Sequence, residues 1–211
     1  RKPTAEHAVE VGRAMARMHL ASQDFAPKRH NALGLTGWRP LFDKFSARSD
    51  DIMPGLHKLV SNELDALEQN WPRGLPEGVI HADLFPDNVF FSEGKLTGLI
   101  DFYFACNDAY AYDVAVCLNA WCFEGDGSFN ITKGRALLST YRAIRPFTSA
   151  EVAALPVLAR GAALRFLLTR LYDWINRDDT ALVKVKDPLE YATKLRFHQS
   201  AADAQAYGWP A

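Results

Sequence analysis

The sequence lacks an excess of charge of either sign and any long apolar run. Its formal net charge is −1, whereas nucleic-acid binders need many Lys and Arg side chains to neutralise phosphates. No uninterrupted apolar run approaches the ~20 residues of a membrane-spanning helix. The most apolar stretch, 152–168, is broken by Pro156, Arg160 and Arg165. We therefore expect neither a nucleic-acid partner nor a membrane partner.

Cysteine is also scarce, and the first residues lack the apolar segment of a signal peptide. The three cysteines, Cys106, Cys117 and Cys122, cannot all pair with one another, and their spacing matches no familiar zinc pattern. Cys117 and Cys122 lie in an apolar segment, which favours buried free thiols. These features predict a protein of the reducing, cytoplasmic compartment.

What the sequence does contain predicts a folded, mainly helical domain. A hydrophobic fraction of 48% in 211 residues is too high for a disordered chain. Apolar residues three and four apart, with capping residues before them, predict helices from Thr4, from Pro54, after Asp113, over 131–144, over 152–174 and from Pro188 to about Asp203. Thr148, with Glu151 three residues later, has the form of a capping box before the stretch 152–174. Residues 27–40 are interpreted as a loop.

The middle of the chain has a different residue pattern, which is typical of strands and turns. Short β-prone runs at 79–80, 89–91 and 96–100 are separated by a polar, proline-containing loop and by a tight turn at 92–95. The predicted fold class is therefore mainly α with a small central β element.

The residues that carry chemistry lie in this middle part. His81-Ala82-Asp83-Leu84-Phe85-Pro86-Asp87-Asn88 has the pattern H-x-D-x-x-x-x-N, and Leu99-Ile100-Asp101-Phe102 follows after a β-turn-β unit. Phosphoryl transfer from ATP needs an acid to orient the acceptor hydroxyl and hard oxygen ligands for Mg²⁺. An Asp, an Asn five residues later and a second Asp after a strand are the kinase arrangement of these groups.

These motifs resemble the ATP-dependent small-molecule kinases related to aminoglycoside phosphotransferases and choline kinases, which are distant relatives of protein kinases. Together with the segment 112–121, they look most like the bacterial members that phosphorylate L-homoserine in threonine biosynthesis. The resemblance is densest over 79–124 and implies ATP and Mg²⁺ as cofactors. It also implies the protein kinase-like fold, which is α+β when complete.

The resemblance assigns roles to single positions. It makes Asp83 the catalytic base and makes Asn88 and Asp101 the Mg²⁺ ligands. His81 matches the motif histidine, which usually supports the backbone in such loops, and Asp113 matches an Asp that braces the catalytic loop.

Two further positions, Phe90 and Ile100, match residues that line the adenine pocket in this family. Complete members also carry an N-terminal lobe with a phosphate-binding lysine and a loop over ATP, and neither G-x-G-x-x-G nor a V-A-I-K-like strand occurs in this sequence. We therefore expect residues 1–211 to be the helical C-terminal catalytic lobe, with catalytic loop 81–88 and metal loop 100–102. The nucleotide-binding lobe would then lie outside this chain.

Alternatives remain open at the level of sequence. The acceptor could be that of a choline, aminoglycoside or methylthioribose kinase, and the same polar residues would also suit a metal-dependent phosphoester hydrolase or a non-catalytic binding lobe. Arg160, Arg165 and Arg170, five residues apart, could be ordinary paired arginines or could recognise a substrate carboxylate. The sequence does not indicate the oligomeric state.

Overall fold

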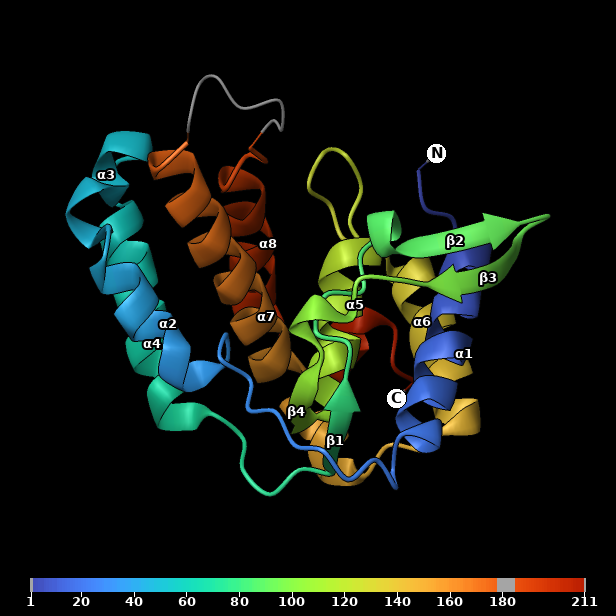
Figure 1. Cartoon of the computed structure of the whole chain (residues 1–211). Coiled ribbons are helices and arrows are strands. Elements are labelled where there is room, and N and C mark those ends of the chain that lie inside the picture. Colours follow the sequence, from blue (N-terminus) through green and yellow to red (C-terminus); the bar gives the residue numbers. More distant parts are fainter. Residues whose placement is uncertain (1, 178–184, 211) are drawn as a thin grey trace.

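The structure is a computed structural model that describes residues 2–177 and 185–210, and it is the predicted helical domain with a small β element (Figure 1). The helices are α1 (Ala5–Ala21), α2 (Leu35–Asp43), α3 (Ser49–Ile52), α4 (Leu56–Asn70), α5 (Tyr110–Trp121), α6 (Ile131–Ile144), α7 (Ser149–Ile175) and α8 (Leu189–Ser200). The strands are β1 (Glu77–Ile80), β2 (Val89–Ser92), β3 (Lys95–Leu99) and β4 (Cys106–Ala109).

Two of the predicted helix starts are fixed by capping boxes. The Thr4 hydroxyl accepts from the backbone N–H of His7 at the start of α1, and Thr148 does the same with Glu151 at the start of α7. The side chains of His7 and Glu151 in turn accept from the backbone N–H groups of Thr4 and Thr148. Four backbone donors are therefore paired by local contacts alone. The last helix begins later than predicted, at Leu189, with Pro188 as its capping residue.

The interpretation of residues 27–40 as a loop is wrong over its second half. Helix α2 begins at Leu35 and includes Pro40, whose missing N–H weakens a helix interior. Burial compensates, because Trp38 and Phe42 are enclosed and the Trp38 indole donates to the Leu33 carbonyl at 2.7 Å. Tertiary packing thus overrides the local signal of proline.

The β element consists of two separate antiparallel pairs, where a single small β region was predicted. β2 and β3 form the predicted hairpin, with Val89 opposite Leu99. β1 pairs with β4, a strand that the sequence did not predict, with Ile80 opposite Cys106. These two pairs hold both ends of the loop 81–88, so the β element fixes the segment in which the candidate site residues lie.

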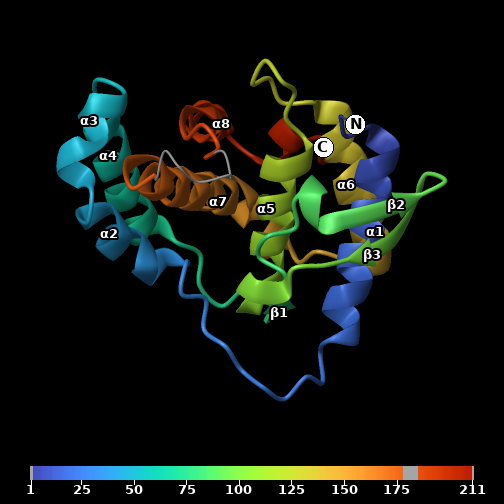
Figure 2. The same cartoon turned by 45° about the horizontal axis from the view of Figure 1, so that its top comes forward.

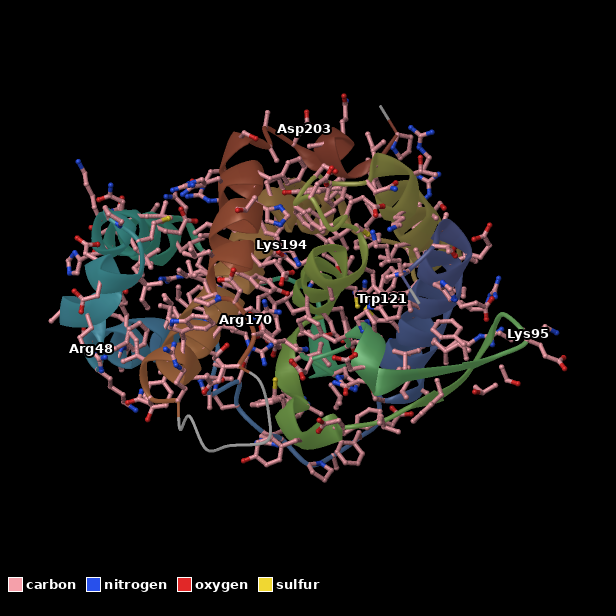
Figure 3. All side chains as sticks on the ribbon, turned by 90° about the horizontal axis from the view of Figure 1, so that it is seen from above. Arg48, Lys95, Trp121, Arg170, Lys194 and Asp203 are labelled. Carbon is pink, nitrogen blue, oxygen red and sulfur yellow. The ribbon has the colours of Figure 1, made fainter. Side chains whose placement is uncertain are left out.

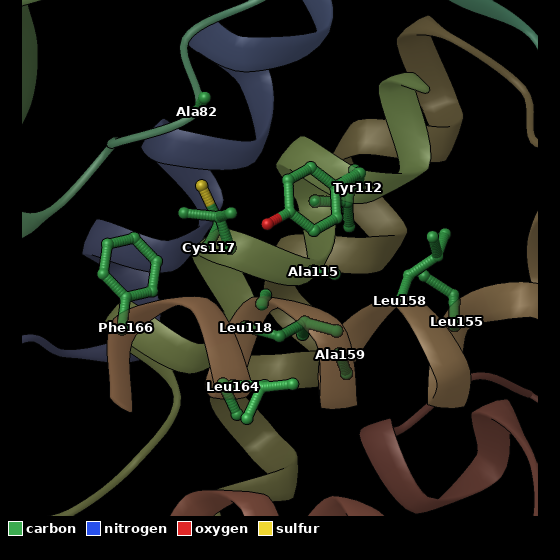
Figure 4. Close-up of a cluster of buried hydrophobic side chains, with 14 of the residues drawn as sticks. Ala82, Tyr112, Ala115, Cys117, Leu118, Leu155, Leu158, Ala159, Leu164 and Phe166 are labelled. Carbon is green, nitrogen blue, oxygen red and sulfur yellow. The ribbon is translucent and has the colours of Figure 1, made fainter. Parts of the chain in front are cut away.

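The core is built around the contact of α5 and α7. Ala115 on α5 and Ala159 on α7 are small, buried side chains that let the two helices approach closely (Figure 4). The amide of Asn119 bridges the two helices, donating to the carbonyls of Ala115 and Ala159 at 3.0 and 3.1 Å. The three cysteines are buried free thiols, which confirms the prediction for Cys117 and Cys122 and adds Cys106.

Within the described residues, α7 alone has the length and apolar composition of a membrane-spanning helix. About 67% of that apolar window is buried inside the domain, where α7 packs against α5 on one side and α8 on another. The helices α2 and α4 lie beyond α7, and α1 packs on α6 at the opposite side (Figures 1 and 2). The apolar length of α7 is therefore explained by its place in the core.

Candidate active site

The loop 81–88 is anchored by a buried carboxylate of α5. Asp113 is fully buried, and its two oxygens accept from the backbone N–H groups of His81 and Ala82 at 2.9 and 2.8 Å. Ala82 adopts φ 63°, a left-handed conformation that costs free energy for any residue with a Cβ. The Asp113 carboxylate holds the backbone in this strained turn, which directs the next residue, Asp83, away from the core.

Asp113 is itself held by His19 of α1, whose ring is in turn held by Tyr141 of α6. The His19 ring lies 3.0 Å from Asp113 through Nε2 and 2.8 Å from the Tyr141 hydroxyl through Nδ1. Burial alone would raise the pKa of Asp113, but the hydrogen bond and charge of His19 and the backbone N–H of His81 outweigh it and lower that pKa below its ordinary value. Asp113 is therefore a buried, ionised acceptor.

His81 uses both ring nitrogens within the protein. Its Nε2 lies 3.0 Å from the Ile100 carbonyl, to which it donates, and its Nδ1 accepts from the Asp83 N–H at 3.3 Å. The ring is fully buried. His81 thus ties the loop 81–88 to the residue that precedes Asp101, and neither nitrogen is left for a substrate or a metal.

Asp83, Asn88 and Asp101 line one pocket of about 280 Å³. The Asn88 side-chain amide donates to the Asp83 carbonyl at 2.8 Å and to its carboxylate at 3.4 Å. The Ile100 N–H donates to the Asn88 carbonyl at 3.0 Å, which places Asp101 beside Asn88 across the end of the hairpin. The structure therefore brings together the three polar residues that the sequence selected for chemistry.

Arg165 of α7 also lines this pocket. Its side chain is only 2% exposed, Nη1 donates to the Ala82 carbonyl, and Nη2 lies 3.9 Å from the Asp83 carboxylate. The guanidinium also stacks on the Phe166 ring at 4.5 Å. Burial raises the pKa of Asp83, with the Asp101 carboxylate adding to the effect, while Arg165 and His81 oppose it. The result is a carboxylate that is more basic than usual.

The residues of this pocket fit a divalent cation. Asn88 uses its amide N–H groups on Asp83, which leaves its carbonyl oxygen available, and one Asp101 oxygen accepts from the Tyr103 N–H at 3.4 Å while the other meets no protein donor among the described residues. Hard oxygen donors are the ligands of Mg²⁺, which usually takes one or two from protein and the rest from water and phosphate. No group of three His, Cys, Asp or Glu suited to a metal occurs in the described parts of the chain, consistent with such a sparse site.

Phe90 and Ile100 lie outside the pocket, on the β2–β3 hairpin. They are 55% and 42% exposed. Phe90 of β2 pairs with Gly98 of β3, and Ile100 directly follows β3, where its N–H donates to the Asn88 carbonyl. Phe90 and Ile100 are thus exposed apolar side chains close in sequence to Asn88 and Asp101.

Sequence reasoning missed two residues that shape this site. His19 has no role assigned from the sequence, although it follows Met15 by four residues on the buried stripe of α1. For Arg165 the sequence left two interpretations open, an ordinary paired arginine or a contact to a substrate carboxylate, and in the structure it contacts the loop backbone. In both cases the signal available in the sequence was a polar residue on an otherwise apolar helix face. The residue with which each one forms a hydrogen bond can be identified only from the folded structure.

Comparison with known proteins identifies relatives of this chain. A family model described as the phosphotransferase enzyme family matches residues 1–147. A homoserine kinase of Xanthobacter autotrophicus is 65% identical over 208 residues, and one of Rhodospirillum rubrum is 58% identical over the same length. Both alignments cover 99% of this chain, which spans 65% of the length of these relatives.

Solved structures with lower identity share the fold. A choline/ethanolamine kinase family protein from Mesorhizobium loti has a TM-score of 0.64 at 16% identity, covering 98% of this chain and 68% of that one. The amicoumacin kinase hAmiN, solved in complex with AMP-PNP, Ca²⁺ and Ami, has a TM-score of 0.61 at 17% identity over 94% of this chain and 60% of that one. The helical domain is thus the protein kinase-like fold of these small-molecule kinases, as predicted.

Proposed function

Because the chain belongs to the phosphotransferase enzyme family, we propose that the protein containing it transfers the γ-phosphoryl group of ATP to the hydroxyl of L-homoserine. The products are ADP and O-phospho-L-homoserine, an intermediate of threonine biosynthesis. The observation that carries this proposal is the 65% identity to a homoserine kinase over nearly the whole chain, together with the pocket that gathers Asp83, Asn88 and Asp101.

In this proposal Asp83 is the catalytic base. Its carboxylate accepts a hydrogen bond from the acceptor hydroxyl, orients the oxygen towards the γ-phosphorus and takes up the proton as the new bond forms. Its raised pKa supports the role, since a more basic carboxylate accepts a proton more readily. Asp113 and His81 are structural supports, because they hold the loop 81–88 from below without reaching the pocket.

Asn88 and Asp101 would hold Mg²⁺, which neutralises charge on the ATP phosphates when it is bound. Phe90 and Ile100 would contact the adenine ring, and their exposure on the hairpin face supports this role. The pocket is lined by four carboxylates and three cationic side chains, so its own charges do not offset the negative charge of the ATP phosphates.

We also propose that residues 1–211 are the C-terminal catalytic lobe and that a nucleotide-binding lobe, encoded outside this sequence, supplies the phosphate-binding lysine. The 35% of the relatives that this chain does not span leaves room for such a lobe. The protein is proposed to act in the cytoplasm, where three buried free thiols remain reduced.

An acceptor screen with the full-length protein tests the proposed function. ADP release would be measured with L-homoserine, choline, kanamycin and methylthioribose, each with Mg²⁺–ATP. We expect kcat/KM for L-homoserine to exceed that of the other acceptors by about 100-fold or more, the discrimination that a site with matched polar groups achieves. A preference for another acceptor, or hydrolysis of a phosphoester without nucleotide, would contradict the proposal.

A further inference from the structure

The three arginines that recur every five residues on α7 have separate environments. Arg160 holds both oxygens of the buried Glu63 carboxylate, at 2.7 and 2.9 Å, and does not line the pocket of Asp83. Arg165 is committed to the Ala82 carbonyl and to the Asp83 carboxylate. The guanidinium groups of Arg160 and Arg165 are therefore both engaged by other residues of the domain, although the buried Nε of Arg165 has no hydrogen-bond partner among the described residues.

Arg170 lines the pocket with part of its guanidinium unused. Its Nη1 donates to the Glu190 carboxylate at 2.7 Å and to the Asp187 carbonyl at 3.1 Å, and its Cζ lies 4.5 Å from the centre of the Tyr191 ring. Among the described residues, Nε and Nη2 have no hydrogen-bond acceptor. Arg170 lies near the middle of the molecule seen from above, far from the hairpin tip at Lys95 (Figure 3).

A guanidinium that is stacked and anchored through one nitrogen is preorganised for a planar anion. Its remaining N–H groups form a fork that matches the two oxygens of a carboxylate. The side chain is 12% exposed, so it is partly shielded from water yet accessible from the pocket. This environment strengthens a charge-assisted hydrogen bond relative to one on the open surface.

The spacing along α7 suits an acceptor of the size of homoserine. Its hydroxyl oxygen and a carboxylate oxygen are separated by five bonds. In the extended molecule these two oxygens lie about 6 Å apart, because successive bonds of about 1.5 Å meet at an angle. Arg165 lies next to Asp83, where the acceptor hydroxyl would bind, and is therefore too close to bind the carboxylate at the other end of the acceptor. Arg170 lies five residues further along the helix, about 7.5 Å at 1.5 Å per residue.

Asp173 provides a carboxylate on the same side of α7. It follows Arg170 by three residues, so both lie on one helix face, and it lines the same pocket. Within the described residues Asp173 has no hydrogen-bond or ion-pair partner. An unpaired carboxylate beside an incompletely paired guanidinium is complementary to a zwitterion.

We propose that Arg170 binds the α-carboxylate of the acceptor and Asp173 its α-ammonium group, so that α7 selects an amino-acid alcohol. The proposal rests on the proposed function, because it places the acceptor hydroxyl at Asp83. Glu190 and Tyr191 then act as positioning residues that fix the Arg170 guanidinium.

The test compares acceptors that each lack one group, with the full-length protein. 3-Amino-1-propanol is homoserine without the carboxylate, 4-hydroxybutyrate lacks the ammonium group, and L-2-aminobutyrate lacks the hydroxyl and serves as a competitive inhibitor. The variants are Arg170→Met and Asp173→Asn. Arg142→Met is the matched control, because Arg142 also stacks on an aromatic ring, that of Trp209, but lies outside the pocket.

We expect Arg170→Met to lower kcat/KM for L-homoserine by about 10- to 100-fold, mainly through KM, as for a lost hydrogen bond to a charged group. Its kcat/KM for 3-amino-1-propanol should hardly change. Asp173→Asn should show the reverse selectivity, sparing 4-hydroxybutyrate. The Ki of L-2-aminobutyrate should rise in both variants, which reports binding even where an analogue is not phosphorylated.

Two results would overturn the inference while leaving the proposed function intact. One is an equal loss on L-homoserine and 3-amino-1-propanol in Arg170→Met, and the other is an unchanged Ki for L-2-aminobutyrate. A wild-type protein that phosphorylates neither L-homoserine nor its alcohol analogues would refute the proposed function itself. If Arg170→Met melts below the assay temperature, Arg170→Lys keeps the charge and loses the fork, and the same outcomes apply to it.

Discussion

Acidification should destabilise this protein through one buried histidine. His198 lies on α8, fully buried, with Nε2 3.1 Å from the Asn119 side-chain oxygen and Nδ1 3.1 Å from the Tyr207 hydroxyl. The Asn119 oxygen can only accept, so Nε2 carries the proton and Nδ1 accepts from Tyr207. Both ring nitrogens are satisfied in the neutral form. Burial, with the nearby charge of Lys194, lowers the pKa of His198 to about 3.

The size of the effect follows from the difference between the folded and unfolded states. An unfolded histidine has a pKa of about 6.5, so below that pH the unfolded chain binds a proton that the folded protein excludes. Stability is therefore lost as pH falls from about 6.5 towards the folded pKa of about 3. Between pH 7 and pH 5 the loss is about 2 kcal/mol, and any folded pKa below about 4 gives nearly the same figure.

A comparison with His198→Gln isolates this contribution. The glutamine amide can donate to Asn119 and accept from Tyr207 but cannot titrate. Urea unfolding of the full-length protein at pH 7 and pH 5 gives the free energy of unfolding for both proteins. We expect the wild type to lose about 2 kcal/mol more than the variant on acidification. Equal losses in the two proteins would refute the reasoning, whatever the variant costs at pH 7.

Three further predictions concern the loop anchor, the metal ligands and the core. Asp113→Ala leaves buried backbone donors unsatisfied at about 1–3 kcal/mol each, so a melting temperature within error of wild type would contradict its role as anchor. Asp101→Ala should raise the Mg²⁺ concentration needed for half-maximal ATP turnover, and an unchanged Mg²⁺ dependence would contradict its assignment as a ligand. Gly161→Ala places a Cβ against the rings of Trp71 and Trp38 and should cost about 1–3 kcal/mol. Gly125→Ala, whose nearest neighbour is 3.7 Å away, should cost little, and equal melting temperatures of the two variants would argue against this packing.

The sequence predicted the parts of the fold that depend on local chemistry. Thr4 and Thr148 indicated helix starts because a capping box satisfies donors within four residues. The hairpin and the loop 81–88 were visible for a similar reason, since β-prone runs and turn residues alternate there. The candidate site residues came from two segments, 81–88 and 99–102, and from the family resemblance that assigns their roles, and the structure places Asp83, Asn88 and Asp101 around one pocket.

What the sequence did not predict depends on contacts between distant segments. β4 is a strand because it pairs with β1, and its residues, which include Asn107 and Asp108, have little tendency to form strands by themselves. His19 meets a partner 94 residues away and Arg165 one 83 residues away. No local pattern specifies such partners, because either side chain could have been paired within its own helix.

Replacement of Asp83 by Asn is the most direct test of the central claim that this pocket performs phosphoryl transfer. The substitution keeps the size and most hydrogen bonds of the side chain but removes the basic oxygen. In the full-length protein, kcat with L-homoserine should fall by about 10²–10⁴-fold, the usual contribution of a general base, while the melting temperature stays close to that of wild type. Asp87→Asn is the control, since Asp87 lies on the same loop and lines the same pocket but forms an exposed pair with Lys186. Its kcat should stay within about twofold of wild type. A kcat of Asp83→Asn within that same range would contradict the account.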